Sequence, residues 1–337
     1  MPDRPPARPP SIIRRILSLP AIISMALSVA FLVFIITRFD VELSGTWNQV
    51  TDSNPWILAL AVVVHYTTFL FRGARWRLLL QNTSDPDTEV PGVVYCSQLV
   101  LLGWFANSVA WLRLGDAYRA YIYRDEQKGS FSRTIGTILA ERALDMILVS
   151  LLILTAVPFL LDSGDRVTLA VLVLAVSLVA GLAVILAAMT WARALLLRRL
   201  PPFLSIRYER FHQGTIGSFQ RMPEATVWGL LGWSAEIARM YLVVEALGFD
   251  ISLALVVFLT LANSLLTLVP TPGGVGAVEP GVGGLAVRLS GLTATSAAAL
   301  VLIDRAITYF SVILLGAAIF VVRQTFWRSG LAEPAEA

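Results

Sequence analysis

The chain has 337 residues, of which 56% are hydrophobic and only 15% charged, and its mean hydropathy is +0.73. These values exclude an ordinary soluble domain. Apolar runs of about 20 residues recur, the length that crosses a hydrocarbon core of about 30 Å. They lack the two-residue alternation of a membrane β-barrel. The sequence therefore predicts an all-α fold, a polytopic bundle of membrane helices.

The net charge of +3 reflects arginine, because Lys128 is the only lysine. Arginines gather in a few loops, as the positive-inside rule expects of the cytoplasmic side, so no nucleic-acid partner is expected. The single cysteine, Cys96, excludes an intrachain disulfide and a cysteine-based metal cluster. His65 and His212 lie far apart without partners at metal-ligand spacing. We expect no cofactor and no metal site.

The first membrane half is expected over residues 20–190, after a basic, proline-rich cytoplasmic tail at 1–19. The run at 20–36 is interpreted as a retained span, since no small-residue cleavage site follows its end. A second span at 55–71 returns to a loop with Arg72, Arg75 and Arg77. Two further spans are expected at 134–161 and 167–190.

Residues 91–112 are apolar, yet the segment 113–133 that follows them is basic. A single crossing would place this basic loop outside, against the charge rule. A re-entrant hairpin that turns near Gly103–Asn107, or two short helices, removes the conflict.

The loop 191–223 holds six arginines and is expected to be a cytoplasmic linker. The second half, 224–322, contains spans at 224–247 and 294–322, and a cytoplasmic tail follows at 323–337. Between the two spans, residues 253–290 form another broken or re-entrant segment. This topology places both termini on the cytoplasmic side of the cytoplasmic (inner) membrane.

The two halves share an order of short motifs. Ala106-Asn107-Ser108 precedes Glu141-Arg142-Ala143, and Ala262-Asn263-Ser264 precedes Asp304-Arg305-Ala306. Arg75 takes the position that Arg239 has in the second half. The loop charges give the halves opposite orientations, which predicts two inverted repeats, each with a broken segment. Such repeats allow a transporter to alternate its access.

Several ionisable residues fall inside the predicted spans: Glu141, Arg142, Asp145, Glu236, Arg239, Asp304 and Arg305. Charges at this depth are costly unless they are paired or face water. They are either ion-paired struts between helices or a polar path. In the second interpretation the arginines bind a headgroup phosphate, which suits the guanidinium fork, and the acids balance charge or relay protons.

The segment Pro270-Thr271-Pro272-Gly273-Gly274-Val275-Gly276-Ala277-Val278-Glu279 cannot be continuous helix, because its prolines lack N–H donors and its glycines weaken helices. Within a membrane such backbone needs protein or a watery cavity around it, and its glycines allow a phosphate to approach backbone N–H groups. The alternative is a loop on the outer surface, but the apolar neighbours on both sides favour burial. It is not a P-loop, since no Gly-Lys-Ser/Thr follows.

These motifs resemble the transmembrane region of lysylphosphatidylglycerol synthases and the wider family of flippase-like membrane proteins, over about residues 20–322. Pro270–Glu279 is similar to Pro-x-Pro-Gly-Gly-x-Gly-x-x-Glu, and Glu141–Asp145 to Glu-Arg-x-x-Asp. The pattern Asn-x-x-x-Pro-x-Arg-x-Gly-Glu-x-x-Arg is matched at Asn107, Arg113, Gly115, Asp116 and Arg119. Trp111 replaces its proline and Asp116 its glutamate, so the carboxylate is kept and the proline bend is not.

The resemblance implies a lipid transporter of the flippase type rather than an enzyme. In bifunctional members a cytosolic domain aminoacylates phosphatidylglycerol, and the short tail after the last span here gives no reason to expect that activity. The expected substrate is a phospholipid or polyprenyl-phosphate-linked lipid with an anionic headgroup. Movement is expected to be downhill or ion-coupled, since no ATP-binding motif is present.

The candidate binding or transport residues are Asn107, Arg113, Asp116, Arg119, Glu141, Arg142, Asp145, Asn263, Pro270, Pro272, Gly273, Gly274, Gly276, Glu279, Asp304 and Arg305, supported by Arg75, Glu236 and Arg239. Among these, Arg113, Arg119, Arg142 and Arg305 are expected to hold phosphate. Two alternatives stay open: a membrane enzyme that acts on a lipid phosphate, and a non-transporting partner of a separately encoded lipid-modifying enzyme such as a synthetase or glycosyltransferase.

Overall fold

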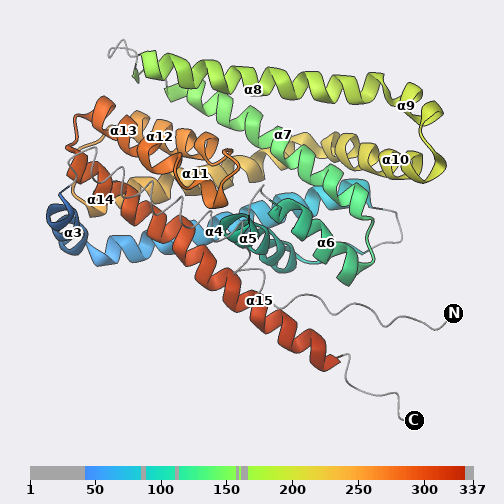
Figure 1. Ribbon diagram of the computed structural model, residues 1–337, viewed down its shortest axis with the longest axis horizontal. Helices are drawn as coiled ribbons and strands as arrows, with labels where there is room; N and C mark the ends of the chain where they lie inside the picture. The colour runs from blue at the N-terminus through green and yellow to red at the C-terminus, as the bar shows by residue number, and fades with distance from the viewer. Residues whose placement is uncertain (1–41, 85–88, 111–113, 157–158, 161–165, 331–337) are drawn as a thin grey trace.

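The computed structural model describes residues 42–84, 89–110, 114–156, 159–160 and 166–330. Within these ranges the regular elements are helices, which confirms the all-α prediction (Figure 1). The expected first span at 20–36 and the candidate residue Arg113 lie outside the described residues.

Two long antiparallel helices form the centre of the bundle, α4 (Pro55–Thr83) and α11 (Met222–Ala246). α4 begins at Pro55 because the Asn54 side chain accepts hydrogen bonds from the next backbone N–H groups and proline suits the first helical position. Asn54 N donates to Ala246 O at 2.9 Å, and Asn82 Nδ2 donates to Ser218 O at 3.1 Å. These bonds join opposite ends of the pair.

The expected loop after residue 71 is wrong. α4 continues to Thr83, so Arg72 and Arg75 lie inside a helix, and both side chains are buried. Carboxylates on a neighbouring helix compensate their charge, which a count of charges along the chain does not register. Arg77 lies near the helix end and donates to Pro91 O at 2.9 Å.

The first broken segment was expected within 91–112, but these residues hold one helix, α5 (Val93–Val109); a second short helix, α6 (Gly115–Gln127), follows and packs on it. The pair α5–α6 is called the first broken segment from here on. α5 is continuous through Gly103–Asn107, so the turn expected there comes after Val109 instead. The close approach of the two helices requires glycine at 115, because a Cβ there would collide with the Gly103 carbonyl oxygen, whereas a Cβ on Gly103 would lie 3.3 Å from the Gly115 carbonyl oxygen.

The second broken segment has the same make-up: α12 (Leu253–Leu266), the short turn η5 (Pro272–Gly274) and α13 (Val278–Ser290). α12 packs on α13, and η5 contacts α5. In Figure 1 α12 and α13 lie toward the left end of the bundle, α5 lies near its middle, and α6 lies to the right of α5. The contact between η5 and α5 brings the two broken segments together.

The remaining helices surround this centre. α7 (Phe131–Ala156) packs on α4 and α12, while α14 (Ala294–Arg305) continues through a π turn, η6 (Ala306–Phe310), into α15 (Ser311–Gly330). The other elements are α3 (Leu43–Asp52), α8 (Arg166–Trp191), α9 (Arg193–Arg199), α10 (Pro202–Gly217) and η4 (Ser218–Arg221). α10 lies closely against α7, since side chains on Gly136 or Gly214 would strike the facing backbone.

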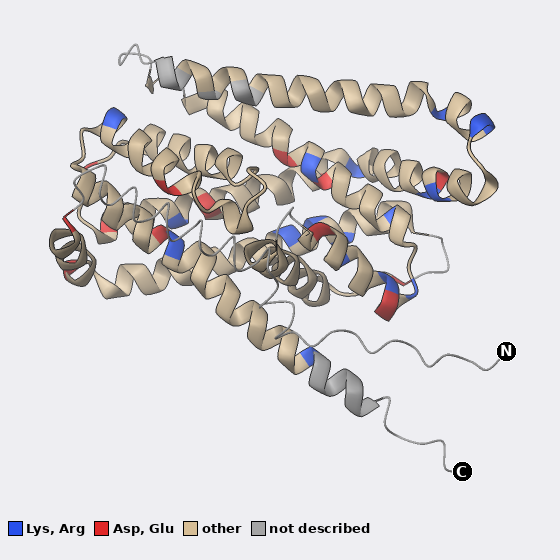
Figure 2. Cartoon of the chain, viewed as in Figure 1, with Lys and Arg blue, Asp and Glu red and all other residues tan. Residues whose placement is uncertain are grey.

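By length and apolar composition, two described helices can cross a membrane, Pro55–Thr83 and Ala294–Arg323, and α8 with α9 gives a third if their 55° bend lies within one span. α5 and α12 have 17 and 14 residues and are shorter than a full crossing requires. Buried apolar residues form one large cluster on α4, α5 and α6 and another on α11 to α14. Charged residues gather between the helices, whereas α8 carries almost none (Figure 2).

Candidate functional site

A buried ion-pair network joins α4, α6 and α7. Arg75 donates to Asp145 Oδ1 at 2.8 Å and to Glu141 Oε1 at 3.3 Å, and Arg119 donates to Glu141 Oε2 at 2.6 Å. All four side chains are at most 5% exposed. Isolated charges are prohibitively costly at such sites, so each carboxylate is shared between arginines from different helices. Glu141 and Asp145 lie on one face of α7, as their spacing predicts.

Arg142 forms the accessible side of this network. Its Nε and Nη2 donate to the two carboxylate oxygens of Asp116 at 3.1 and 2.8 Å. Bidentate pairs of this kind are among the stronger hydrogen-bonded contacts. Asp145 lies farther off, at 3.8 Å. The Arg142 and Asp116 side chains are 25% and 28% exposed, in contrast to the sealed pairs behind them.

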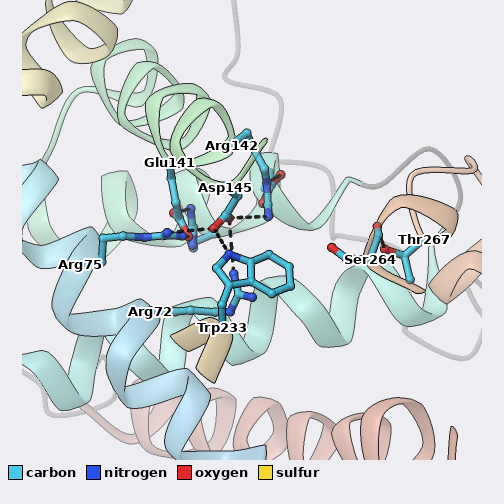
Figure 3. Close-up of polar contacts among 10 residues, drawn as sticks. Arg72, Arg75, Glu141, Arg142, Asp145, Trp233, Ser264 and Thr267 are labelled. Carbon is cyan, nitrogen blue, oxygen red and sulfur yellow. Dashed lines mark hydrogen bonds and ion pairs between the residues drawn. The ribbon is translucent and has the colours of Figure 1, made fainter. Parts of the chain in front are cut away.

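Arg72 completes the network and was not among the candidate residues. Its guanidinium lies between the indoles of Trp104 and Trp233, 5.2 and 5.1 Å from their centroids, and donates to Asp145 Oδ2 at 3.4 Å. Trp233 Nε1 donates to Asp145 Oδ1 at 3.3 Å. Stacking between aromatic rings holds a cation in place while leaving its edge free. Figure 3 shows this cluster, with Ser264 and Thr267 facing it from the other half of the chain.

A second network links α11, α13 and α14. Arg239 forms an ion pair with Asp304 and donates from Nε to Glu236 Oε2 at 3.2 Å. Arg305 Nε lies 2.9 Å from Glu279 Oε1. Glu236 and Arg239 lie three residues apart on one face of α11, and the neighbouring Asp304 and Arg305 pair with different partners, Arg239 and Glu279.

The Pro-Gly segment is irregular, as predicted. Gly273, Gly274 and Gly276 have φ values of 58°, 70° and 89°. Residues with a Cβ rarely adopt such values. Gly276 N donates to Glu279 Oε2 at 2.7 Å, and the Gly273 carbonyl accepts from Arg305 Nη1 at 3.0 Å. Charged side chains therefore satisfy the backbone of this turn. Pro272 is buried and Pro270 is exposed.

A cavity of about 150 Å³ lies where the two networks and the two broken segments meet. Both Ala-Asn-Ser motifs reach it, through Asn107 and Asn263, although their roles differ. Asn107 Oδ1 accepts from Gly115 N at 2.8 Å and so closes the turn into α6, whereas Asn263 Oδ1 is buried without a partner among the described residues.

Of the candidate residues, the cavity lining includes Asn107, Arg142, Asp145, Glu236, Arg239, Asn263, Gly273, Gly274 and Arg305. Outside the lining, although many support it, are Arg75, Asp116, Arg119, Glu141, Pro270, Pro272, Gly276, Glu279 and Asp304. Arg72, Trp104 and Trp233 also line the cavity and were not predicted from the sequence. Each of the three lies three residues, about one helical turn, before a candidate residue, and this spacing was the signal that could have found them. For Arg72 the signal was hidden because the residue was predicted to lie in a loop.

The charged groups of the lining are four arginines and two carboxylates, and its neutral polar groups are mostly amides and hydroxyls. Arg305 Nη2 is buried and has no hydrogen-bond partner within the described part of the chain. Such a surface suits an anionic group with hydrogen-bonding oxygens. No cluster of three or more His, Cys, Asp or Glu residues with metal-binding geometry occurs in the described ranges.

The sequence matches the family described as the lysylphosphatidylglycerol synthase TM region over residues 21–316. The chain belongs to this family. The resemblance inferred from its motifs is thereby confirmed, and the protein is a member of a membrane-protein family with helices able to span a bilayer.

Among similar proteins, a UPF0104 membrane protein of Methanocaldococcus jannaschii is 27% identical over 239 residues, which cover 68% of this chain and 97% of that protein. A UPF0104 membrane protein of Methanothermobacter thermautotrophicus is 22% identical, with 86% of this chain and 91% of the relative covered. The glycosyltransferase AglD of Haloferax volcanii is 25% identical over 88% of this chain and 53% of its own length. No solved structure matches the chain.

Proposed function

We propose that this protein is a lipid transporter that moves a phospholipid or polyprenyl-phosphate-linked headgroup across the cytoplasmic membrane. The observation that carries the proposal is the cavity between the two broken segments, whose lining includes four arginines and only two carboxylates. Cavities of this kind at the interface of two halves are where transporters bind their substrates. The headgroup enters the cavity while the acyl chains stay in the lipid.

Arg142 and Arg305 are the proposed phosphate ligands. Arg142 is the partly exposed arginine of its network, and Arg305 offers an Nη2 without a partner among the described residues. Asp116 pairs with Arg142 and Glu279 pairs with Arg305, and neither carboxylate belongs to the cavity lining. Arg119, paired with Glu141 outside the lining, is better suited to supporting the site than to touching the ligand.

We further propose that the halves are inverted repeats, the first with α5–α6 entering from the cytoplasm and the second with α12–α13 entering from outside. Two observations support this arrangement: the antiparallel packing of α4 and α11, and the presence of one pair of short, mutually packed helices in each half, α5–α6 and α12–α13. In such an arrangement each broken segment gates one side.

Lipid exchange in reconstituted vesicles tests the proposed function. Phosphatidylglycerol with a fluorophore on an acyl chain reports exchange between leaflets and leaves the headgroup intact. A hydrogen bond to a charged group contributes about 1.5–3 kcal/mol, so Arg142→Gln and Arg305→Gln are each expected to slow exchange about 10–100-fold. Arg221→Gln, an exposed arginine paired with Glu224, is the matched control and should leave exchange unchanged. Exchange at the protein-free rate with the unmodified protein would refute transport.

The orientation is tested by single-cysteine labelling. The natural Cys96 is buried, which provides a quiet background. Lys128→Cys after α6 and Asp250→Cys after α11 should react with an impermeant maleimide from opposite sides of the membrane. Labelling from the same side would contradict the inverted arrangement and leave the cavity as the remaining support for transport.

A second candidate function follows from one comparison. A protein named as a glycosyltransferase contains a region similar to this chain within about half of its length. In this second candidate function, the chain does not transport lipid; it binds a lipid substrate and holds it for a separately encoded transferase. That candidate predicts no exchange by the chain alone, together with stimulation of a transferase reaction when this chain is added to membranes that lack it.

A further inference from the structure

His65 and Glu236 form a buried pair beside the cavity. His65 is 0% exposed in the middle of α4, surrounded by the rings of Tyr66, Phe69 and Trp104. Its Nδ1 lies 3.8 Å from Glu236 Oε2, which is somewhat beyond a hydrogen bond. Neither imidazole nitrogen, and not Glu236 Oε1, has a hydrogen-bond partner within the described residues. Buried polar atoms without partners are costly, so the pair is a candidate for a functional role.

Glu236 connects His65 to the cavity. The Glu236 side chain belongs to the lining, whereas His65 lies behind it. The carboxylate is held by Arg239 through Oε2, which leaves Oε1 as the free oxygen. A proton from water in the cavity has a short route to the imidazole across this carboxylate.

The charges around the cavity balance when His65 is neutral. The first network has four arginines and three carboxylates, an excess of one positive charge: Arg72, Arg75, Arg119, Arg142, Asp116, Glu141 and Asp145. The second has two arginines and three carboxylates, an excess of one negative charge: Arg239, Arg305, Glu236, Glu279 and Asp304. A phosphodiester adds one negative charge, and in a poorly solvated cavity an uncompensated charge is disfavoured. One added proton restores the balance.

The surroundings place this proton on His65. Histidine is the side chain whose ordinary pKa lies near neutrality. Some of the groups that surround His65 carry no charge. Trp104 of α5 contacts the His65 ring, and Ser311 of α15 bonds to the neighbouring Tyr66. The titratable residue of η6 is Tyr309. The titratable or charged groups near the pair are Tyr66 and Arg72 on α4, Arg239 on α11, Asp145 on α7 bound to Arg72, and Asp304 on α14 bound to Arg239.

We propose that His65, held against Glu236, takes up one proton when an anionic headgroup enters the cavity, so that headgroup and proton bind together. This inference rests on the proposed transport function. The proton comes from water in the cavity, settles on the imidazole as a cation facing Glu236, and returns to water when the headgroup leaves. No bond other than the N–H is formed or broken.

The test compares two acyl-labelled lipids in reconstituted vesicles between pH 5.5 and 8.0. Phosphatidylglycerol brings one net negative charge, and phosphatidylcholine brings none. Exchange of phosphatidylglycerol should rise about tenfold as the pH falls, while exchange of phosphatidylcholine stays constant. His65→Gln should remove this pH dependence. His212→Gln changes the second histidine of the chain, which lies on α10 outside the cavity lining, and this variant should keep the pH dependence.

A binding measurement covers the case in which His65→Gln does not fold. In weakly buffered detergent solution at pH 7.5, short-chain phosphatidylglycerol should cause uptake of about one proton per protein chain, and short-chain phosphatidylcholine none. Phosphatidylglycerol exchange that is independent of pH, or binding without proton uptake, overturns the inference and leaves transport standing. An equal pH dependence for both lipids, or one retained in His65→Gln, also overturns it. If neither phosphatidylglycerol nor phosphatidylcholine is exchanged at any pH, both the transport function and this inference are refuted.

Discussion

The buried pair between Arg119 and Glu141 offers a direct test of the ion-pair network. The two side chains are each 2% exposed and 2.6 Å apart, and the Arg119 guanidinium also lies 4.4 Å from the Trp76 ring centroid. Removing one partner of a buried pair leaves the other charge uncompensated, at a cost of roughly 3–5 kcal/mol. At about 2–4 °C per kcal/mol, Arg119→Gln and Glu141→Gln should each lower the melting temperature by roughly 6–20 °C.

The double variant distinguishes a specific pair from general disruption. Two glutamines hydrogen-bond each other without charge, so Arg119→Gln with Glu141→Gln should be no less stable than the worse single variant. Thermal unfolding in detergent, followed by size-exclusion chromatography, gives the four values of the cycle. Coupled residues show an interaction free energy above about 0.5 kcal/mol. Additive losses would refute the pairing, and the exposed pair of Arg221 and Glu224 is the control expected to show no change.

Three further variants probe other parts of the site. Gly273→Ala forces a Cβ into a left-handed conformation (φ 58°) and against the Tyr309 ring. It should slow lipid exchange and cost about 1–2 kcal/mol; unchanged exchange would contradict the role of the turn. Arg72→Lys keeps the charge but replaces the planar guanidinium near two indoles with a compact ammonium group. Exchange should fall several-fold without loss of folding, and full activity would argue against a role for these ring contacts. Gly214→Val should separate α10 from α7 and lower the melting temperature, while the folded fraction exchanges lipid normally because the cavity is distant.

The sequence was sufficient for the helical membrane class and for the irregular Pro-Gly segment. Both depend on local chemistry: apolar length sets the class, and Pro272 with its neighbouring glycines prevents a regular helix wherever it lies. The motif order also pointed to residues that meet in space, since Asn107 and Asn263 line the same cavity.

The partners of the charged residues were beyond the reach of sequence patterns. Spacing along α7 indicated that Glu141 and Asp145 share a face, but not that Arg75 and Arg72 from another helix would meet them. Charge counting treats arginine as a sign of a loop, and here three-dimensional pairing allows it inside a helix. The end of α5 was misplaced for a similar reason: Gly103 lies within the helix and faces Gly115 of α6, instead of forming a turn.

The π turn between α14 and α15 has a mechanical consequence. It adds one residue to a helix that otherwise advances about 100° per residue, so it sets the rotation of α15 relative to Arg305. Downstream, Ser311 contacts Tyr66, and Arg323 contacts Gln98 and Glu126. Deleting a single residue from 306–310 would turn all these contacts away while leaving Asp304 and Arg305 in place. The π turn thus fixes the rotation of α15 about its axis, and with it which side chains of α15 face the rest of the bundle, independently of the residues at the cavity.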